Sequence, residues 1–155
     1  MAHDAQEKLP GRVLALDVGS RTIGLAVTDP LGYTAQGLAT IRRKNKRTDL
    51  AALAEVIGSY GVVELVVGLP LRMSGAEGRQ SAQMREFVAM LQKQFDLPIH
   101  LWDERLTSVE ANRVLRESEM SIRKRAAVVD QLAAVLILQN WMEARRHATP
   151  HGDDL

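Results

Sequence analysis

The chain of 155 residues contains no cysteine. Without thiols, neither a disulfide framework nor a thiolate zinc site can form. This composition suits a reducing compartment, so we expect the protein to be cytoplasmic. No apolar run approaches the length of a membrane span, and the first residues lack the apolar segment of a signal peptide. We therefore expect no membrane attachment.

Aromatic residues are also scarce, at 4% of the chain. This scarcity argues against nucleic-acid binders of the RRM or OB type, which stack bases on aromatic side chains. The net charge is only +1, from 20 basic and 19 acidic residues, so the total charge does not identify a partner. With 46% hydrophobic and 25% charged residues, the composition is that of an ordinary globular domain with a core. A nucleic-acid partner would be recognised through its backbone and shape.

Two short apolar runs, at residues 13–18 and 22–28, flank a turn and predict an antiparallel strand pair. We expect Gly19 to provide the flexibility of the turn. Asp17 interrupts the first run, where an ionised carboxylate is costly unless a cation or several donors compensate it. Asp17 is therefore either a residue that caps the turn at Gly19 and Ser20, or a metal ligand or acid-base group on a rigid strand.

The remaining pattern predicts a third strand over residues 33–41, in which Gly37 marks a bulge or a close backbone approach. A helix over residues 48–60 should end at Gly61, followed by a buried parallel strand at 62–67. A second amphipathic helix surrounds residues 84–95, and a short strand covers 98–102. Residues 107–110 form a capping box that opens a third helix. A final helix is expected over residues 121–146.

This order of elements predicts an α/β fold: a five-stranded mixed sheet, made of an antiparallel meander and parallel βαβ crossovers, with helices on both faces. We expect one domain over residues 11–146 between disordered tails at 1–10 and 147–155. The predicted apolar stripe of the final helix is formed by Val128, Val129, Leu132, Ala133, Val135, Leu136, Ile137, Gln139 and Asn140.

Two basic segments are candidates for contacts to phosphate. Residues 42–47 carry five cations, and this run is either a solvated loop or a phosphate-contacting loop. The second segment precedes or opens the final helix, where cations oppose the helix dipole, so a local stabilising role is weak. The cations of the two segments are Arg42, Arg43, Lys44, Lys46 and Arg47, and Arg123, Lys124 and Arg125.

Four segments together resemble the YqgF family of RNase H-like nucleases. They are residues 16–26 (LDVGSRTIGLA), 67–71 (VGLPL), 103–108 (DERLTS) and 129–134 (VDQLAA), in this order along most of the chain. The resemblance implies an RNase H-like fold, with the first strand beside the fourth. It also implies an endonuclease that matures the 5′ end of pre-16S ribosomal RNA or resolves Holliday junctions in branched DNA.

The same resemblance implies that Asp17, Glu104 and Asp130 are the catalytic acids and meet at one edge of the sheet. Like charges so close together would repel, and Mg²⁺ or Mn²⁺, which prefer oxygen ligands, would resolve the conflict. Two alternatives stay open: Asp103 could be the ligand in place of Glu104, and Asp130 could pair with Arg123 or Arg125. Further candidates for nucleic-acid contact are Arg21, Arg72, Arg105 and Thr107; at Arg72 the family pattern has a smaller polar residue. The protein would act as a monomer or homodimer.

Two other classes compete with a nuclease. A non-catalytic nucleic-acid-binding module would have eroded acids, whereas all three acids are present here. The Asp-x-Gly pattern at residues 17–19 also opens actin-like ATPases, but these need two such lobes and the chain has length for one. His100, Trp102 and Trp141 are interpreted as packed residues and not as catalytic or stacking groups.

Overall fold

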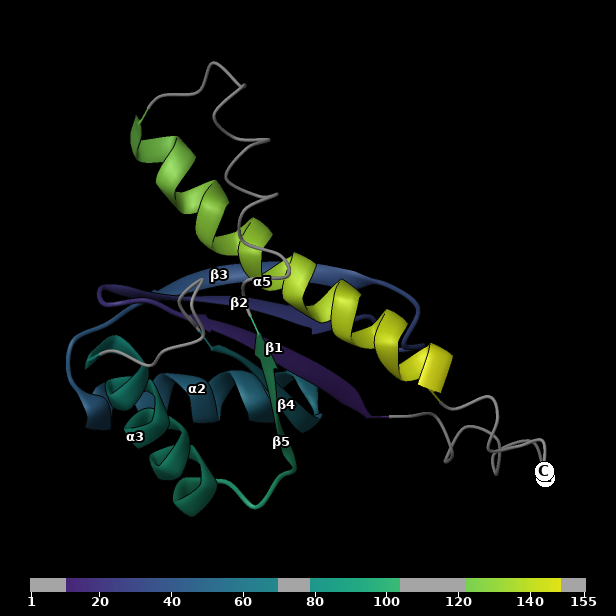
Figure 1. The fold of residues 1–155 in the computed structure, drawn as a ribbon, viewed down its shortest axis with the longest axis horizontal. Coiled ribbons are helices and arrows are strands. Elements are labelled where there is room, and N and C mark those ends of the chain that lie inside the picture. Colours follow the sequence, from purple (N-terminus) through teal and green to yellow (C-terminus); the bar gives the residue numbers. More distant parts are fainter. Residues whose placement is uncertain (1–10, 70–78, 104–121, 149–155) are drawn as a thin grey trace.

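The computed structural model describes residues 11–69, 79–103 and 122–148, with side chains described except at 79–81, 122–130 and 148. Within these ranges the chain forms a five-stranded sheet and three helices (Figure 1). No helix among the described residues is long and apolar enough to cross a bilayer. The predicted helix that begins at the capping box, and both predicted tails up to residue 10 and from residue 149, lie outside the described residues.

The predicted hairpin is confirmed: β1 (Arg12–Val18) pairs antiparallel with β2 (Thr22–Thr28), and β2 pairs antiparallel with β3 (Ala35–Arg42). The third strand starts two residues later than predicted. Asp29 Oδ1 accepts hydrogen bonds from the backbone N–H groups of Tyr33 and Thr34, at 2.7 and 2.9 Å, and so retains both residues in the turn. Gly32 adopts a φ of 77° in the same turn, which favours glycine.

The chain then alternates between helices and strands. The order is α2 (Lys46–Tyr60), β4 (Val62–Leu69), α3 (Arg79–Gln94), β5 (Ile99–Asp103) and α5 (Ile122–Ala148). Helix α2 starts earlier than predicted because Asn45 caps it, accepting a 2.8 Å hydrogen bond from the N–H of Thr48. It ends at Gly61, as predicted, in the left-handed conformation with φ 63°. Helix α5 extends two residues beyond the predicted end.

The strand order is β3-β2-β1-β4-β5, with β4 parallel to both β1 and β5. The first strand is therefore central and lies beside the fourth, as the resemblance implied. Two crossovers through α2 and α3 connect the parallel strands, which is the usual route between parallel neighbours. The mixed five-stranded sheet predicted from the sequence is confirmed.

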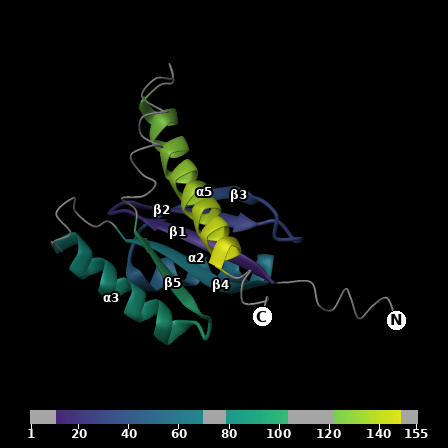
Figure 2. The ribbon, with the colours of Figure 1, turned by 45° about the vertical axis from the view of Figure 1, so that its right-hand side comes forward.

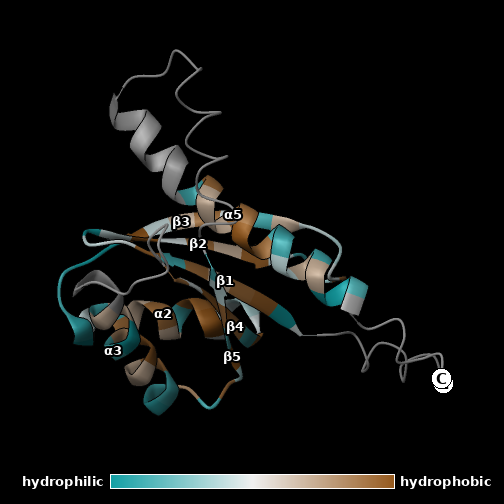
Figure 3. Cartoon of the chain, viewed as in Figure 1, coloured by the Kyte–Doolittle hydropathy of each residue, from teal (hydrophilic) through white to brown (hydrophobic). Residues whose placement is uncertain are grey.

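The sheet is the middle layer of three, with α2 and α3 on one face and α5 running diagonally over the other (Figures 1 and 2). Apolar colour is concentrated on the central strands and on parts of α2 and α5 (Figure 3). The alternation of strand residues divides the core in two. The larger cluster, on the α2/α3 face, includes Leu14, Leu16, Val67, Leu69 and Leu91. The smaller, on the α5 face, includes Val13, Ala15, Val66, Ala134 and Ile137.

The predicted stripe of α5 is wrong at its C-terminal end. Ala133, Ala134, Ile137 and Leu138 are buried, whereas Gln139 and Asn140 are exposed. Asn140 instead donates a 2.8 Å hydrogen bond to the carbonyl of Leu136 within its own helix. The buried face of the helix is thus rotated by about one position from the predicted face, and it includes the small Ala134, which is fully buried against the sheet.

Candidate active site

Asp17 is the penultimate residue of β1. Strand alternation places it on the α5 face, the face of Val13 and Ala15. It is half-buried, between the fully buried Leu16 and the buried Val18 of the opposite face. The carboxylate therefore lies on a rigid central strand, where burial of a charge requires compensation by donors or a cation.

Glycines flank Asp17 on both neighbouring strands. Gly24 is its direct partner on β2. On β4, Gly68 follows Val67, which is the partner of Leu16. Neither glycine carries a side chain, so these two positions on β2 and β4 leave room beside the Asp17 carboxylate, which, like Asp103, has an interaction partner of its own. Gly24 was within the sequence segment that carried the family resemblance, but its place beside Asp17 follows only from the strand register.

Asp103 lies at the same end of the sheet but on the opposite face. The parallel register pairs it with Leu69, a member of the α2/α3-side cluster, while the preceding Trp102 packs against the α5-side cluster. Asp103 is half-buried and has an interaction partner of its own. The sheet therefore separates Asp103 from Asp17, which disfavours Asp103 as a shared ligand. The predicted site residues Glu104, Arg105, Thr107 and Arg72 lie outside the described residues.

Helix α5 crosses the sheet from β3 toward the start of β1. At one end the Gln131 side chain donates a 2.9 Å hydrogen bond to the carbonyl of Leu38 on β3. At the other, Trp141 and Met142 line a cavity together with Gly11 and Val13. Position 130 precedes Gln131 directly and lies four residues before the buried Ala134. The backbone of Asp130 is thus in α5, as predicted, at the end of the helix away from the start of β1.

The meeting of the three acids stays a prediction. Among the residues whose side chains are described, no group of three His, Cys, Asp or Glu residues is arranged to hold a metal ion. That part of the chain includes Asp17 but neither Glu104 nor the side chain of Asp130. The alternative pairing of Asp130 with Arg123 or Arg125 likewise falls outside the described side chains, as does Lys124, although all three cations belong to the first turn of α5.

The first basic segment follows β3 and enters α2. Arg42, Lys44, Lys46 and Arg47 are exposed, as is Arg21 in the turn after Asp17. Arg43 differs: its Nη1 donates a 2.7 Å hydrogen bond to the carbonyl of Gly19, and its Nε lies 3.3 Å from Asp49 Oδ2. The basic run is therefore mixed: Arg43 is bound within the fold, whereas the other four cations are exposed to solvent.

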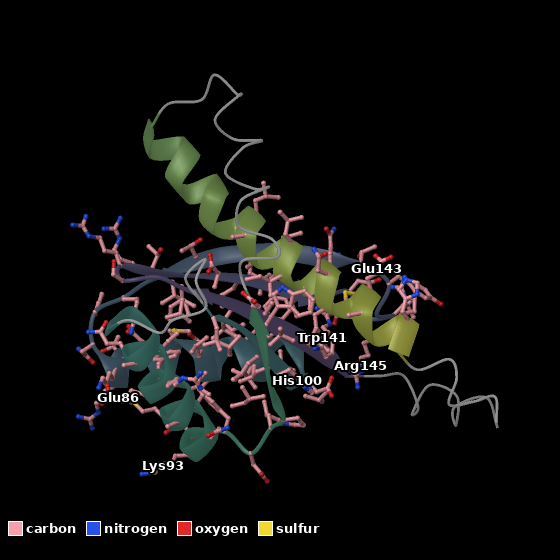
Figure 4. All side chains as sticks on the ribbon, viewed as in Figure 1. Glu86, Lys93, His100, Trp141, Glu143 and Arg145 are labelled. Atoms are coloured by element: carbon pink, nitrogen blue, oxygen red, sulfur yellow. The ribbon has the colours of Figure 1, made fainter. Side chains whose placement is uncertain are left out.

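A second polar cluster lies at the start of β4, away from Asp17. Arg145 of α5 makes a bidentate ion pair with Glu64, with N–O distances of 2.6 and 3.2 Å, and its guanidinium lies 4.7 Å from the Trp141 ring centroid. His100 packs against Trp141 at 5.1 Å between ring centroids, and its Nε2 is 3.6 Å from Glu64 (Figure 4). Burial opposes ionisation of Glu64, but Arg145, with help from His100, lowers the pKa of Glu64 below its ordinary 4.5.

Glu64, Trp141 and Arg145 of this cluster line a cavity of about 500 Å³ near the start of β1, at the opposite end of that strand from Asp17. Sequence reasoning interpreted His100 and Trp141 as packed residues, which the structure confirms, but it missed Glu64 and Arg145. These two residues are 81 positions apart, and no local pattern links them.

Comparison with known proteins identifies the family. The sequence profile of the RuvX family, described as Holliday junction resolvase, matches residues 11–144. The chain belongs to this family. One relative, from Koribacter versatilis (strain Ellin345), is 67% identical, over 87% of this chain and 88% of the relative. Another, from Moorella thermoacetica (strain ATCC 39073 / JCM 9320), is 54% identical, over 85% of this chain and 94% of the relative. Both relatives carry the name "Putative pre-16S rRNA nuclease".

Solved structures establish that this RuvX chain has the RNase H-like fold of the RuvC-type resolvases. RuvC of T. thermophilus in complex with Holliday junction substrate superposes with a TM-score of 0.54 at 14% identity, over 88% of this chain and 96% of that one. The Fowlpox virus resolvase in complex with junction DNA gives 0.53 at 12% identity, over 86% and 97%. At these identities the likeness concerns the fold.

Proposed function

We propose that this protein is a metal-dependent endonuclease that hydrolyses phosphodiester bonds, and that its substrate is the 5′ end of pre-16S ribosomal RNA. The observation that carries the proposal is Asp17: a half-buried carboxylate on the central strand, on the face covered by α5, with glycine on either side. A carboxylate at a half-buried strand position requires compensating donors or a cation, which supports a role in metal binding. The names of the Koribacter and Moorella relatives support the choice of RNA as substrate.

The residues fit a hard divalent cation. Carboxylate oxygens are the ligands that Mg²⁺ and Mn²⁺ prefer, and the chain has no cysteine to favour a softer metal. In the proposal Asp17, Glu104 and Asp130 hold Mg²⁺ or Mn²⁺. The position of Asp103 on the face of Leu69 supports the choice of Glu104 over Asp103. When bound, such ions stabilise the charge that develops on the attacking and leaving oxygens of a phosphodiester.

The chain's own residues would hold the substrate. The exposed cations of the first basic segment and Arg21 would contact phosphates beside the acids, together with Arg72, Arg105, Thr107 and the cations that open α5. The absence of side chains at Gly24 and Gly68 would let a sugar-phosphate backbone approach Asp17. The products would carry 5′-phosphate and 3′-hydroxyl ends. We further propose that a single domain over residues 11–146 acts in the cytoplasm, as a monomer or homodimer.

The family description favours a second candidate, resolution of branched DNA, and a non-catalytic nucleic-acid-binding module is the third. End-labelled pre-16S ribosomal RNA and a four-way DNA junction, each incubated with the protein and Mg²⁺ or Mn²⁺, separate the three. The proposal predicts a discrete cut in the RNA and an intact junction. Cleavage of the junction alone would establish the resolvase function. Binding of both substrates without any cut would establish the binding module.

A further inference from the structure

Arg43 connects three elements around the turn that follows Asp17. Its Nη1 donates to the carbonyl of Gly19 at 2.7 Å, and its backbone N–H donates to the carbonyl of Arg21 at 2.8 Å. Its guanidinium carbon lies 5.2 Å from the centroid of the Phe87 ring on α3. The side chain is only 24% exposed, although five of the six residues from 42 to 47 are basic. Residue 43 therefore binds the β1–β2 turn from both its backbone and its side chain.

Asp49 completes this arrangement from α2. Its side chain is 2% exposed, and a carboxylate buried to this degree requires partners. Oδ2 accepts from Arg43 Nε at 3.3 Å, and Oδ1 accepts from the backbone N–H of Lys44 at 3.0 Å. Asp49 thus fixes both the guanidinium and the backbone of the next residue. We call Arg43, Asp49 and the turn carbonyl of Gly19 the turn clamp.

Within the described part of the chain, the neighbouring cations make no comparable set of contacts. The contact between Lys46 Nζ and Glu86 is 3.9 Å long, and both side chains are more than half exposed, so the pair contributes little. Arg42 and Lys44 are exposed on either side of Arg43. The turn clamp therefore determines where these exposed cations lie relative to the turn, and the turn begins two residues after Asp17.

We propose that Arg43 is a positioning residue, which holds the turn after Asp17 and the exposed cations of the basic segment in one fixed geometry. This inference rests on the proposed nuclease function, in which those cations contact substrate phosphates. A phosphodiester bound by the cations would then meet the Asp17 carboxylate at a set distance, and small misplacements of reacting groups are costly to rate. Lysine cannot replace arginine here, because one ammonium cannot reach the Gly19 carbonyl, Asp49 and the Phe87 ring together.

The test compares Arg43→Lys with Arg12→Lys. Arg12 is a matched control because its guanidinium also lies over a ring, 5.4 Å from the Tyr60 centroid, but at the opposite end of β1. We expect Arg43→Lys to lower kcat by at least ~10-fold with a much smaller change in KM, at a temperature where both variants are folded. Arg12→Lys should leave both constants within ~2-fold of wild type. Equal kinetics in the two variants would overturn the proposal.

Amide hydrogen exchange provides a readout that does not depend on activity. The N–H of Gly19 donates to Thr22, and that of Arg43 to Arg21, so both should exchange at least ~10-fold faster in Arg43→Lys. The N–H of Gly32, in the other hairpin turn, should be unchanged. Asp49→Asn, which keeps the side-chain shape, should give the same pattern with a smaller effect, and replaces Arg43→Lys if that variant does not fold. If the wild type cuts no substrate, the proposed function fails, and unchanged exchange at Gly19 would separately overturn the turn clamp.

Discussion

The contact between Gly37 and Gln131 gives a quantitative test of how α5 lies on the sheet. Gly37 is on β3, paired with Ala26. A Cβ added there would lie 3.0 Å from both Cγ and Cδ of Gln131, closer than side chains normally approach. Gly37→Ala must therefore displace the Gln131 side chain, which donates a 2.9 Å hydrogen bond to the Leu38 carbonyl. Because Gln131 adjoins Asp130, this contact also reports on the placement of a proposed catalytic acid.

Two effects on the free energy of unfolding oppose each other in Gly37→Ala. Loss of the exposed Gln131 hydrogen bond costs about 1 kcal/mol. Replacing glycine stabilises by about 0.4–1 kcal/mol, because the unfolded chain loses conformational freedom and Gly37 is not among the described glycines with positive φ. The single substitution should therefore destabilise the protein by at most about 0.6 kcal/mol. In a Gln131→Ala background the obstacle is gone, and Gly37→Ala should stabilise by about 0.4–1 kcal/mol.

Urea unfolding of the four proteins of this double-mutant cycle measures the coupling, which we expect to be about 1 kcal/mol. Gly58→Ala is the control: a Cβ at Gly58 in α2 meets nothing within 4 Å, so its effect should be the same in both backgrounds. If Gly37→Ala stabilised equally with and without Gln131, the two residues would not be in contact, and the position of α5 over β3 would be refuted.

Three further results are expected. Glu64→Gln should destabilise the protein by about 1 kcal/mol at pH 7 and progressively less as pH falls below 4.5. The reason is that the lowered pKa of Glu64 adds stability, which is lost when the carboxylate is protonated in the folded state. Thermal melting of both proteins from pH 7 to 3 measures this difference, and a difference that does not depend on pH would contradict the expectation. Millimolar Mn²⁺ should raise the melting temperature of the wild type but not of Asp17→Asn, by mass action on a metal site, and equal shifts would place the bound ion elsewhere. The exposed cations of the basic segment are Arg42, Lys44, Lys46 and Arg47. Neutralising all four should weaken RNA binding and flatten the dependence of the binding constant on salt concentration. An unchanged salt dependence would show that the segment is a solvated face.

The sequence was sufficient for the sheet, because strand signals here are local. Alternating and continuous apolar runs located all five strands, and the order of elements predicted their mixed topology. Gly37 was interpreted as a bulge or a close backbone approach; the close contact there is with the Gln131 side chain, and the register shift between β2 and β3 lies beyond it, between the pairs Leu25–Leu38 and Ile23–Ile41. Gly19 does not use the conformational freedom of glycine that was expected, because its φ is not positive. The turn instead leaves little room for a side chain: a Cβ at Gly19 would lie 3.3 Å from the carbonyl oxygen of Thr22.

Long-range polar pairs could not be predicted in the same way. Arg43 looked like its basic neighbours, and only the fold brings it to Gly19, 24 residues earlier in the chain. Asp49 was not singled out from the sequence, yet this acidic residue in the first turn of α2 is almost fully buried. Charged side chains have no periodic signal that distinguishes a solvated ion from a buried pair, so these assignments needed the tertiary structure. For the candidate site, the cost of burying a charge drew attention to Asp17 but left a turn-capping role open, and the catalytic roles of Asp17, Glu104 and Asp130 were all implied by the family resemblance.

Cleavage by Asp17→Asn tests the central claim most directly. The substitution preserves the shape of the side chain and removes the charge beside Gly24 and Gly68. If Asp17 holds the catalytic metal, cleavage of pre-16S ribosomal RNA should fall by at least ~100-fold, while RNA binding is retained because phosphate contacts lie elsewhere. Asp103→Asn, on the opposite face of the sheet, should keep most of the activity. A rate for Asp17→Asn equal to that of the wild type would contradict the account.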